Sequence, residues 1–266
     1  MSHNCGLWWG AMPGDEDTWV KSFSASLPGS YRNRYGANEI RLHASIAKAR
    51  GDQPARVGVV PTSGEGLAVC VVAKDAPGLF SNIAAALRLQ GFDIVHAEAY
   101  TRRMESGERE VLDLFRLQLQ QGRTLDTAAA SDIAAAISST LHDLLAGRLD
   151  PLQALPAPEP ELVGMFHDTR VRFIEGEDGA LCTLEVETDD RSGLLLTLAR
   201  ALSGQKVSVE RSEVQTMASR VLDRFTLAEQ DGSPISESRR LNIQVAVISA
   251  IESLVWTPRN SQRPLH

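Results

Sequence analysis

The sequence predicts an α+β fold built from two similar units, each a four-stranded antiparallel sheet with two helices on one face. Two observations lead to this expectation. A short acidic and glycine-containing segment follows an apolar run at Asp75–Phe80, and a related segment follows another apolar run at Asp190–Leu195, 115 positions later. Leu87 and Leu202 keep the same separation, so the match extends through the following helix. Such a collinear duplication indicates two homologous domains.

The two copies differ in length at one turn. The segment 112–115 (Leu-Asp-Leu-Phe) matches 222–225 (Leu-Asp-Arg-Phe) at a separation of 110 instead of 115. The first copy therefore has five extra residues in the hairpin around Gly107, as expected if length changes occur in surface turns.

The elements of the first unit follow from its apolar periodicity. Strands are expected at 56–60 and 67–73. A helix follows with Phe80, Ile83, Ala84 and Leu87 on one face, and Gly91 ends it. A strand pair is expected at 92–101 and 110–118, and a second helix from about 126 to 145.

The second unit repeats this order. Strands are expected at 169–174 and 181–188, then a helix from Leu194, a strand pair at 207–216 and 220–228, and a last helix at 236–254. Within 181–188 the apolar residues Cys182, Leu184 and Val186 alternate with polar ones. This alternation predicts one buried face and one face exposed to water.

Each unit thus has the order β-β-α-β-β-α, a cyclic variant of the ferredoxin-like βαββαβ pattern. Pairing the two sheets side by side would protect their edge strands. The expected divisions are a leader at 1–51, a first domain at 52–148, a Pro-rich linker at 149–164, a second domain at 165–256 and a disordered tail at 257–266. The leader should contain a helix at 38–50 with Asn38 as N-cap. It is interpreted as a strap packed on a domain, or as the remnant of a longer parent protein.

Composition narrows the class of protein. A net charge of −7 and an apolar fraction of 43% favour neither nucleic acid nor a membrane as partner. The first residues lack the features of a signal peptide, so a cytoplasmic location is expected. The three cysteines and six histidines show no ligand spacing, and the His-Asp pairs at His142 and His167 are isolated. No metal, cofactor or catalytic residue is expected.

The repeated motif resembles the ACT domain, a small-molecule regulatory module. Asp75–Phe80 with Leu112-Asp113-x-Phe115, and Asp190–Leu195 with Asp231-Gly232, look like the two C-terminal ACT domains of the bacterial PII uridylyltransferase/uridylyl-removing enzymes. The nucleotidyltransferase and phosphohydrolase domains of that family have no counterpart in this sequence. The resemblance therefore implies a regulatory chain that is not itself an enzyme.

The strand-to-helix loop is the candidate binding site. Its aspartate can face an ammonium group, while glycine and the first helical amides can approach a carboxylate. The same atoms could merely cap the helix and permit the turn. The candidate ligand-binding residues are Asp75, Ala76, Pro77, Gly78, Leu79 and Asn82 in the first copy, and Asp190, Ser192, Gly193 and Leu194 in the second.

Three functions remain open at this point. The first is a sensor that binds a small amino acid, glutamine by resemblance, and signals to a protein partner in nitrogen or amino-acid metabolism, with the chain forming a homodimer. The second is a part of the uridylyltransferase whose catalytic domains lie elsewhere. The third is a structural ACT pair with vestigial ligand loops.

Overall fold

The computed structural model describes residues 13–61, 66–104, 106–120, 130–155, 168–175, 181–217 and 219–254. Within these ranges the chain has the expected α+β character and is built on one antiparallel sheet of eight strands. The expected tail lies outside the described residues, as does much of the expected linker, of which the 3-10 helix η2 (Pro151–Ala154) is described. No described helix is both long enough and apolar enough to cross a membrane.

Both halves of the chain contribute the same order of elements. The first half contains β1 (Ala55–Val60), β2 (Leu67–Lys74), α4 (Leu79–Leu89), β3 (Phe92–Arg103), β4 (Arg109–Leu119) and α5 (Ala130–Leu145). The second half contains β5 (Arg170–Glu175), β6 (Cys182–Asp189), α6 (Leu194–Gly204), β7 (Val207–Met217), β8 (Arg220–Glu229) and α7 (Glu237–Ser253). These elements appear in the order expected from the sequence, and most bounds differ from the expected ones by a residue or two.

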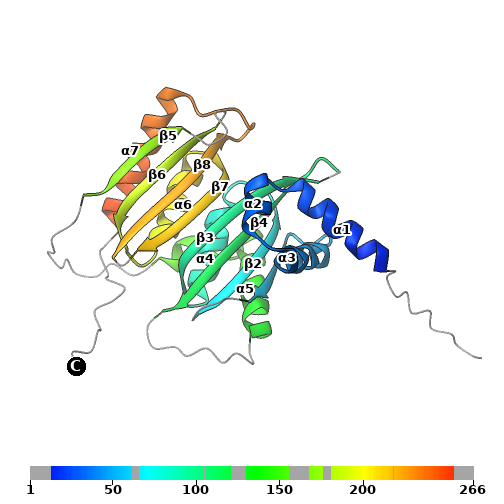
Figure 1. The fold of residues 1–266 in the computed structure, drawn as a ribbon. Coiled ribbons are helices and arrows are strands. Elements are labelled where there is room, and N and C mark those ends of the chain that lie inside the picture. The colour runs from blue at the N-terminus through cyan, green and yellow to red at the C-terminus, as the bar shows by residue number, and fades with distance from the viewer. Residues whose placement is uncertain are drawn as a thin grey trace, which may run out of the picture.

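The eight strands follow the order β1-β2-β4-β3-β7-β8-β6-β5, in which the second half reverses the first. The halves join where β3 pairs with β7, from His96 opposite Gln215 to Tyr100 opposite Arg211. Figure 1 shows the resulting continuous sheet. Joining the halves in this way pairs two strands that would otherwise be edges, and it leaves β1 and β5 at the ends of the sheet.

The duplication seen in the sequence is repeated in fine backbone detail. The β3–β4 register shifts between Ile94 and His96, and the β7–β8 register shifts between Val209 and Arg211. The two bulges are 115 positions apart, like the loops. A bulge re-aims the strand locally, and both halves have it at the equivalent position.

A single apolar layer lies between the sheet and helices α4 to α7. It is continuous through both halves and includes Ile83, Leu87, Phe115, Leu198, Leu202 and Phe225. Ring contact between Phe80 and Phe225, with centroids 6.2 Å apart, ties the helix of one half to the strand of the other. Helices α4 and α6 also contact each other directly.

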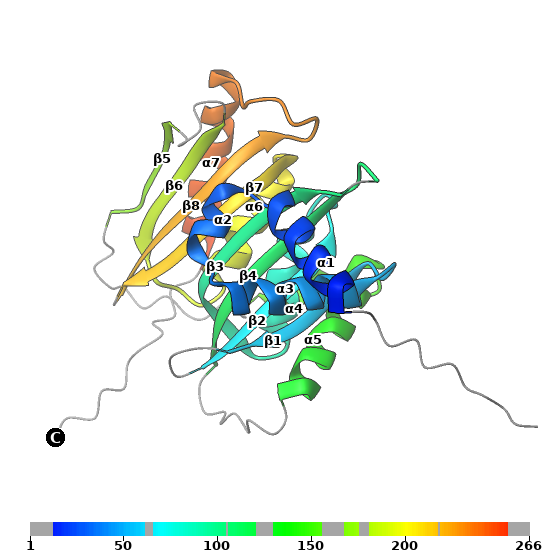
Figure 2. The ribbon, with the colours of Figure 1, turned by 45° about the vertical axis from the view of Figure 1, so that its right-hand side comes forward.

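The leader covers the opposite face of the first half. Helices α1 (Pro13–Ser26), α2 (Gly29–Arg34) and α3 (Ala37–Arg50) lie over the strands of this half, as Figure 2 shows. Phe23, Leu27 and Tyr31 form a second apolar cluster there with Cys70 and Tyr100 of the sheet. The leader therefore packs as a strap on the first half, which is one of its two expected interpretations.

Two expectations need correction. The N-cap of α3 is Gly36 and not Asn38, because Glu39 Oε2 accepts the Gly36 amide at 2.8 Å and the helix begins earlier. The polar face of β6 is also more buried than expected, with Thr183 and Glu185 buried and Glu187 half-buried. Glu185 is 5% exposed, because Arg172 and Arg224 of the two neighbouring strands cover it and bind its carboxylate at 2.6 and 2.9 Å.

Candidate functional site

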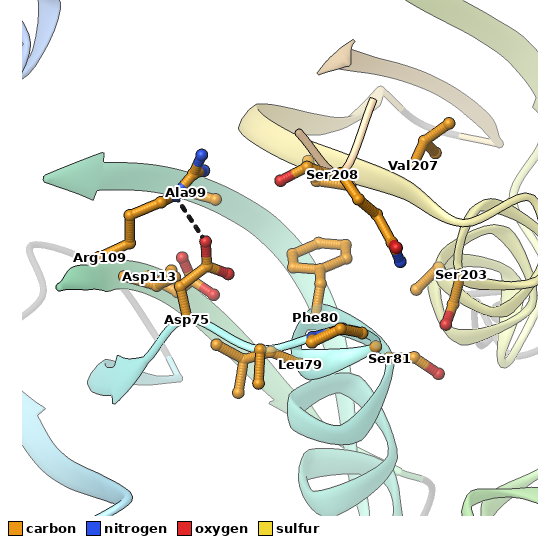
Figure 3. A pocket seen from close by; sticks show the side chains of 17 residues that line it. Asp75, Leu79, Phe80, Ser81, Ala99, Arg109, Asp113, Ser203, Val207 and Ser208 are labelled. Carbon is orange, nitrogen blue, oxygen red and sulfur yellow. Dashed lines mark ion pairs between the residues drawn. The ribbon is translucent and has the colours of Figure 1, made fainter. Parts of the chain in front are cut away.

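A cavity of about 350 Å³ lies between the two halves. One wall is the loop Asp75–Phe80, which connects β2 to α4, and the facing wall comes from α6 and the start of β7. Figure 3 shows both walls. The lining residues are Asp75, Ala76, Pro77, Gly78, Leu79, Phe80, Ser81, Ala99, Arg109, Val111, Asp113, Ala199, Ser203, Val207, Ser208, Val209 and Gln230. Its volume falls in the range typical of small-molecule sites.

Glycine sets the shape of the first loop. Gly78 is the N-cap of α4 in the left-handed conformation, with φ of 75°, which a residue with a side chain rarely adopts. A Cβ at this position would lie 3.1 Å from Ser203 Oγ across the cavity. The loop thus brings bare backbone close to the second half. The amides of the first turn of α4 begin at the cavity wall, where a helix favours negative charge.

Aspartate does not cap this helix. The Asp75 side chain forms an ion pair with Arg109 Nε at 2.8 Å, and the N-cap of α4 receives no side-chain hydrogen bond. The alternative in which Asp75 merely caps the helix is therefore wrong. Its side chain lies at the wall of the cavity instead.

Arg109 joins the two halves at the side of the cavity. It pairs with Asp75 of the first half and, through Nη2 at 2.6 Å, with Glu210 of the second. Burial alone would lower the pKa of Arg109, but its contacts with Glu210 and Asp75 raise it, so the guanidinium stays charged. Two carboxylates around one guanidinium leave this side of the cavity with a negative balance.

Asp113 is a buried carboxyl group in the floor of the cavity. Its residue is 1% exposed, and neither carboxyl oxygen has a hydrogen-bond partner among the described residues. Val71 of β2 and Ala99 of β3 are its neighbours across the sheet, so its surroundings are apolar. Burial, with a smaller contribution from the negative charge of Asp75, raises the pKa of Asp113 well above its usual range.

The second loop has the same backbone as the first. Gly193 has φ of 79°, and the Leu194 amide bonds to Arg191 O at 3.1 Å, as the Leu79 amide does to Ala76 O. Its aspartate amide bonds to Ser219 O, as that of Asp75 does to Arg109 O. Its side chains are arranged differently. Arg191 is 5% exposed and donates to Ile251 O at the end of α7, so this loop is buried against its own half.

The two halves differ at the positions that form the facing wall of the cavity. Ser203 and Ser208 of the second half face that loop. The residues 115 positions earlier are Arg88 and Asp93, which form a partly buried ion pair. Small hydroxyls thus line the cavity at positions whose equivalents in the first half carry a charged pair.

Some of the expected site residues line the cavity and others do not. Asp75, Ala76, Pro77, Gly78 and Leu79 line it, whereas Asn82 does not. The second-loop residues Asp190, Ser192, Gly193 and Leu194 do not line it either. Asp113 was visible in the sequence as part of a repeated Leu-Asp-x-Phe motif, but its position in the site was missed. No pattern in the sequence marks Arg109 or the serines of α6 and β7 as site residues, since their place in the site depends on how the halves pair.

Of the two His-Asp pairs noted in the sequence, the structure describes one. His142 Nε2 lies 2.9 Å from Ala55 O and attaches α5 to β1, and His167 is outside the described residues. Among the residues that the structure describes, no group of three or more His, Cys, Asp or Glu is arranged to hold a metal ion.

Comparison with known proteins gives a consistent set of relatives, although no family model matches the chain. The bifunctional uridylyltransferase/uridylyl-removing enzyme of Cupriavidus pinatubonensis is 29% identical over 230 residues, which cover 84% of this chain and 24% of that enzyme. The enzymes of the same name from Phenylobacterium zucineum and Cupriavidus metallidurans are 25% and 30% identical, covering 88% and 78% of this chain and 25% and 22% of theirs.

These matches confirm the resemblance inferred from the sequence. The chain spans about a quarter of the length of the curated relatives it matches. Among solved structures, aspartate kinase from Synechocystis is similar with a TM-score of 0.39 and 12% identity, covering 90% of this chain and 33% of that one. That score is too low to establish a shared fold.

Proposed function

We propose that this chain is a regulatory protein that binds a small amino acid in the cavity between its two halves and passes the binding state to a protein partner. We further propose that its halves, 52–148 and 165–256, are two ACT-like domains. The observation that carries the proposal is one cavity wall, on which the Asp75 carboxylate and the first turn of α4 lie side by side.

The chemistry of this wall suits a zwitterion. The carboxylate of an amino acid is favoured at the start of a helix, where amides and the helix dipole offer positive charge. Its ammonium group is favoured by Asp75, and Glu210 adds negative charge on the facing strand. Both charged ends of one small molecule thus find partners within a single loop and its neighbour.

Ligand binding between the halves would give the chain a means of signalling. A ligand shifts an equilibrium only by its different affinity for two arrangements. Because the cavity has walls from both halves, a bound molecule stabilises their present arrangement. The partner is expected to act in nitrogen or amino-acid metabolism, and glutamine is the expected ligand, by resemblance to the uridylyltransferase/uridylyl-removing enzymes.

A second candidate is that the chain acts as the regulatory part of such an enzyme. It is supported by the coverage, since the relatives are named as enzymes and this chain matches about a quarter of each. In that case any uridylyl transfer would need residues outside the segment that matches here.

A thermal-shift screen of the chain against the twenty amino acids, followed by calorimetric titration, tests the proposal. We expect a concentration-dependent rise in Tm with a small amino acid. Asp75→Ala should abolish that rise, whereas Asp190→Ala, the matched change in the loop that does not line the cavity, should leave it. Equal loss in both variants, or no shift with any amino acid, would overturn the proposal. A shift with UTP and magnesium would show that the chain binds a nucleotide and would overturn a purely regulatory role.

A further inference from the structure

We propose that Asp113, as a neutral carboxyl group, forms hydrogen bonds with the side chain of the bound amino acid. It thereby selects an uncharged side chain that both donates and accepts a hydrogen bond. The inference rests on the proposed function and deepens it, by assigning selectivity to a residue outside the two glycine loops. It starts from a buried carboxyl group that lines a ligand-sized cavity and has no hydrogen-bond partner in the part of the chain that the structure describes.

Asp113 lies apart from the charged rim of the cavity, which is formed by Asp75, Arg109 and Glu210. It lies on β4 between Val111 and Phe115, two residues of the apolar layer, and faces the same cavity as Leu79 and Phe80 of α4. Figure 3 shows its side chain beside that of Asp75, below the Asp75–Arg109 ion pair. A ligand held by its ammonium and carboxylate groups at the rim would therefore place its side chain over this floor.

A buried carboxyl group without a partner costs free energy, and a charged one costs more. Asp113 is consequently held neutral by its apolar surroundings and by the nearby charge of Asp75. In that form it offers one O–H donor and one carbonyl acceptor. A primary carboxamide offers the complementary pair, so the two groups satisfy each other completely.

Charged side chains fit this floor poorly. A carboxylate would bring a third negative group beside Asp75 and Glu210, with Arg109 as the cation at the site. An ammonium group would have to ionise Asp113 and form a buried ion pair without further hydrogen bonds, an arrangement that gains little. An apolar side chain would leave the carboxyl group unsatisfied.

Protonation of Asp113 then becomes part of binding. The charged and titratable groups around it are Asp75 on the loop, Arg109 on β4, Glu210 on β7 and the Cys70 thiol of β2 on the other face of the sheet. The residues of α4 and α6 that line the cavity carry no charge. Because the neutral form binds the ligand, affinity should fall once the pH rises far enough to ionise Asp113.

The experiment measures selectivity, which a merely structural role would not change. The Kd of the full chain is measured by calorimetry for L-glutamine, L-glutamate, L-methionine and L-lysine at pH 6 and pH 8, in the wild type, in Asp113→Leu and in Asp223→Leu. Asp223 occupies the equivalent buried position of the second half and does not line the cavity, so it is the matched control.

We expect the wild type to prefer glutamine over the other three ligands. Asp113→Leu has a side chain of similar size that neither donates nor accepts a hydrogen bond, so it leaves the carboxamide of bound glutamine unsatisfied. Its preference for glutamine over methionine should therefore fall by about tenfold or more. Any loss of glutamine affinity between pH 6 and pH 8 should disappear in this variant, and Asp223→Leu should behave like the wild type.

The outcomes separate the two proposals. An unchanged glutamine-to-methionine ratio in Asp113→Leu, or a wild type that prefers lysine, glutamate or methionine, overturns the role of Asp113 while leaving an amino-acid site in place. Failure of the wild type to bind any amino acid in the earlier screen overturns the proposed function and this inference with it.

Discussion

Glu98 of β3 lies directly opposite Glu213 of β7, and this pair marks the centre of the internal symmetry. The two residues are 115 positions apart, so each is the counterpart of the other. Their surroundings differ completely. Glu98 is buried and accepts hydrogen bonds from Tyr35 and Tyr100 at 2.6 and 2.7 Å, whereas Glu213 is half-buried and accepts one from Gln215. The strap contributes Tyr35, so it breaks the symmetry at its centre.

The first prediction concerns the acid stability that Glu98 provides. Burial would raise its pKa, but hydrogen bonds from His96, Tyr35 and Tyr100 and the charge of Arg34 together lower it to about 2. The unfolded chain binds a proton near pH 4.3, so the stabilisation is present above that pH and is lost as the pH falls toward 2. We expect it to amount to about 3 kcal/mol at neutral pH.

Urea unfolding of the wild type and of Glu98→Gln between pH 7 and pH 2 measures this effect. The variant should be less stable at pH 7, and the difference between the two proteins should shrink as the pH falls. A constant difference across this range would contradict the assignment of the pH dependence to Glu98.

Acidification should also destabilise the strap through His43, and at a higher pH than it does through Glu98. Its side chain accepts or donates a 2.8 Å hydrogen bond with Tyr31 inside the second apolar cluster, and burial lowers its pKa to about 4. The unfolded chain protonates near pH 6.5 while the folded one stays neutral, so stability falls as the pH drops from 6.5 to 4, by about 3 kcal/mol. The signal is Trp19 fluorescence, since its ring belongs to this strap. His43→Gln should abolish the change in this window.

Asp113 should make the folded chain less stable as the pH rises. Its pKa is raised by burial, so the unfolded chain ionises near pH 3.9 while the folded chain must keep the proton. Stability is therefore greatest below pH 3.9 and declines by up to about 1.4 kcal/mol per pH unit until the folded form also ionises. Asp113→Asn removes this penalty, so its Tm relative to the wild type should rise from pH 4 to pH 7. A variant that is equally destabilised at both pH values would show that the carboxyl group has a partner.

The loop backbone was within reach of sequence reasoning, because its shape is local. A glycine followed by an apolar helix, repeated after an acidic residue, requires the left-handed turn that Gly78 and Gly193 adopt. The residues of the facing wall could not be predicted from the sequence. Ser203 and Ser208 reach the first loop only through the pairing of β3 with β7, and periodicity within a strand contains no information about the register between distant strands.

The glycines provide a matched pair of backbone changes. Gly78→Ala and Gly193→Ala both place a side chain at positive φ, so each should cost roughly 1–2 kcal/mol in the free energy of unfolding. Only the first change lies in the cavity, where the new Cβ would approach Ser203 Oγ at 3.1 Å. Denaturant unfolding should show similar losses for both variants, while titration with the amino acid found in the screen should show weaker binding for Gly78→Ala alone. Equal loss of binding would mean that the loop acts through stability.

The asymmetry between the halves leads to the last prediction. Arg88 and Asp93 form an ion pair at the positions equivalent to Ser203 and Ser208. The double change Ser203→Arg with Ser208→Asp places the same pair on the wall of the cavity, where half-buried side chains can form a new charge pair. We expect this variant to fold with a Tm close to that of the wild type and to bind the ligand about a hundredfold more weakly. Ser203→Ala with Ser208→Ala is the control, because it keeps the space and should retain binding. If the charged variant still binds with wild-type affinity, the ligand does not occupy this cavity, and the equivalent region of the other half becomes the place to look.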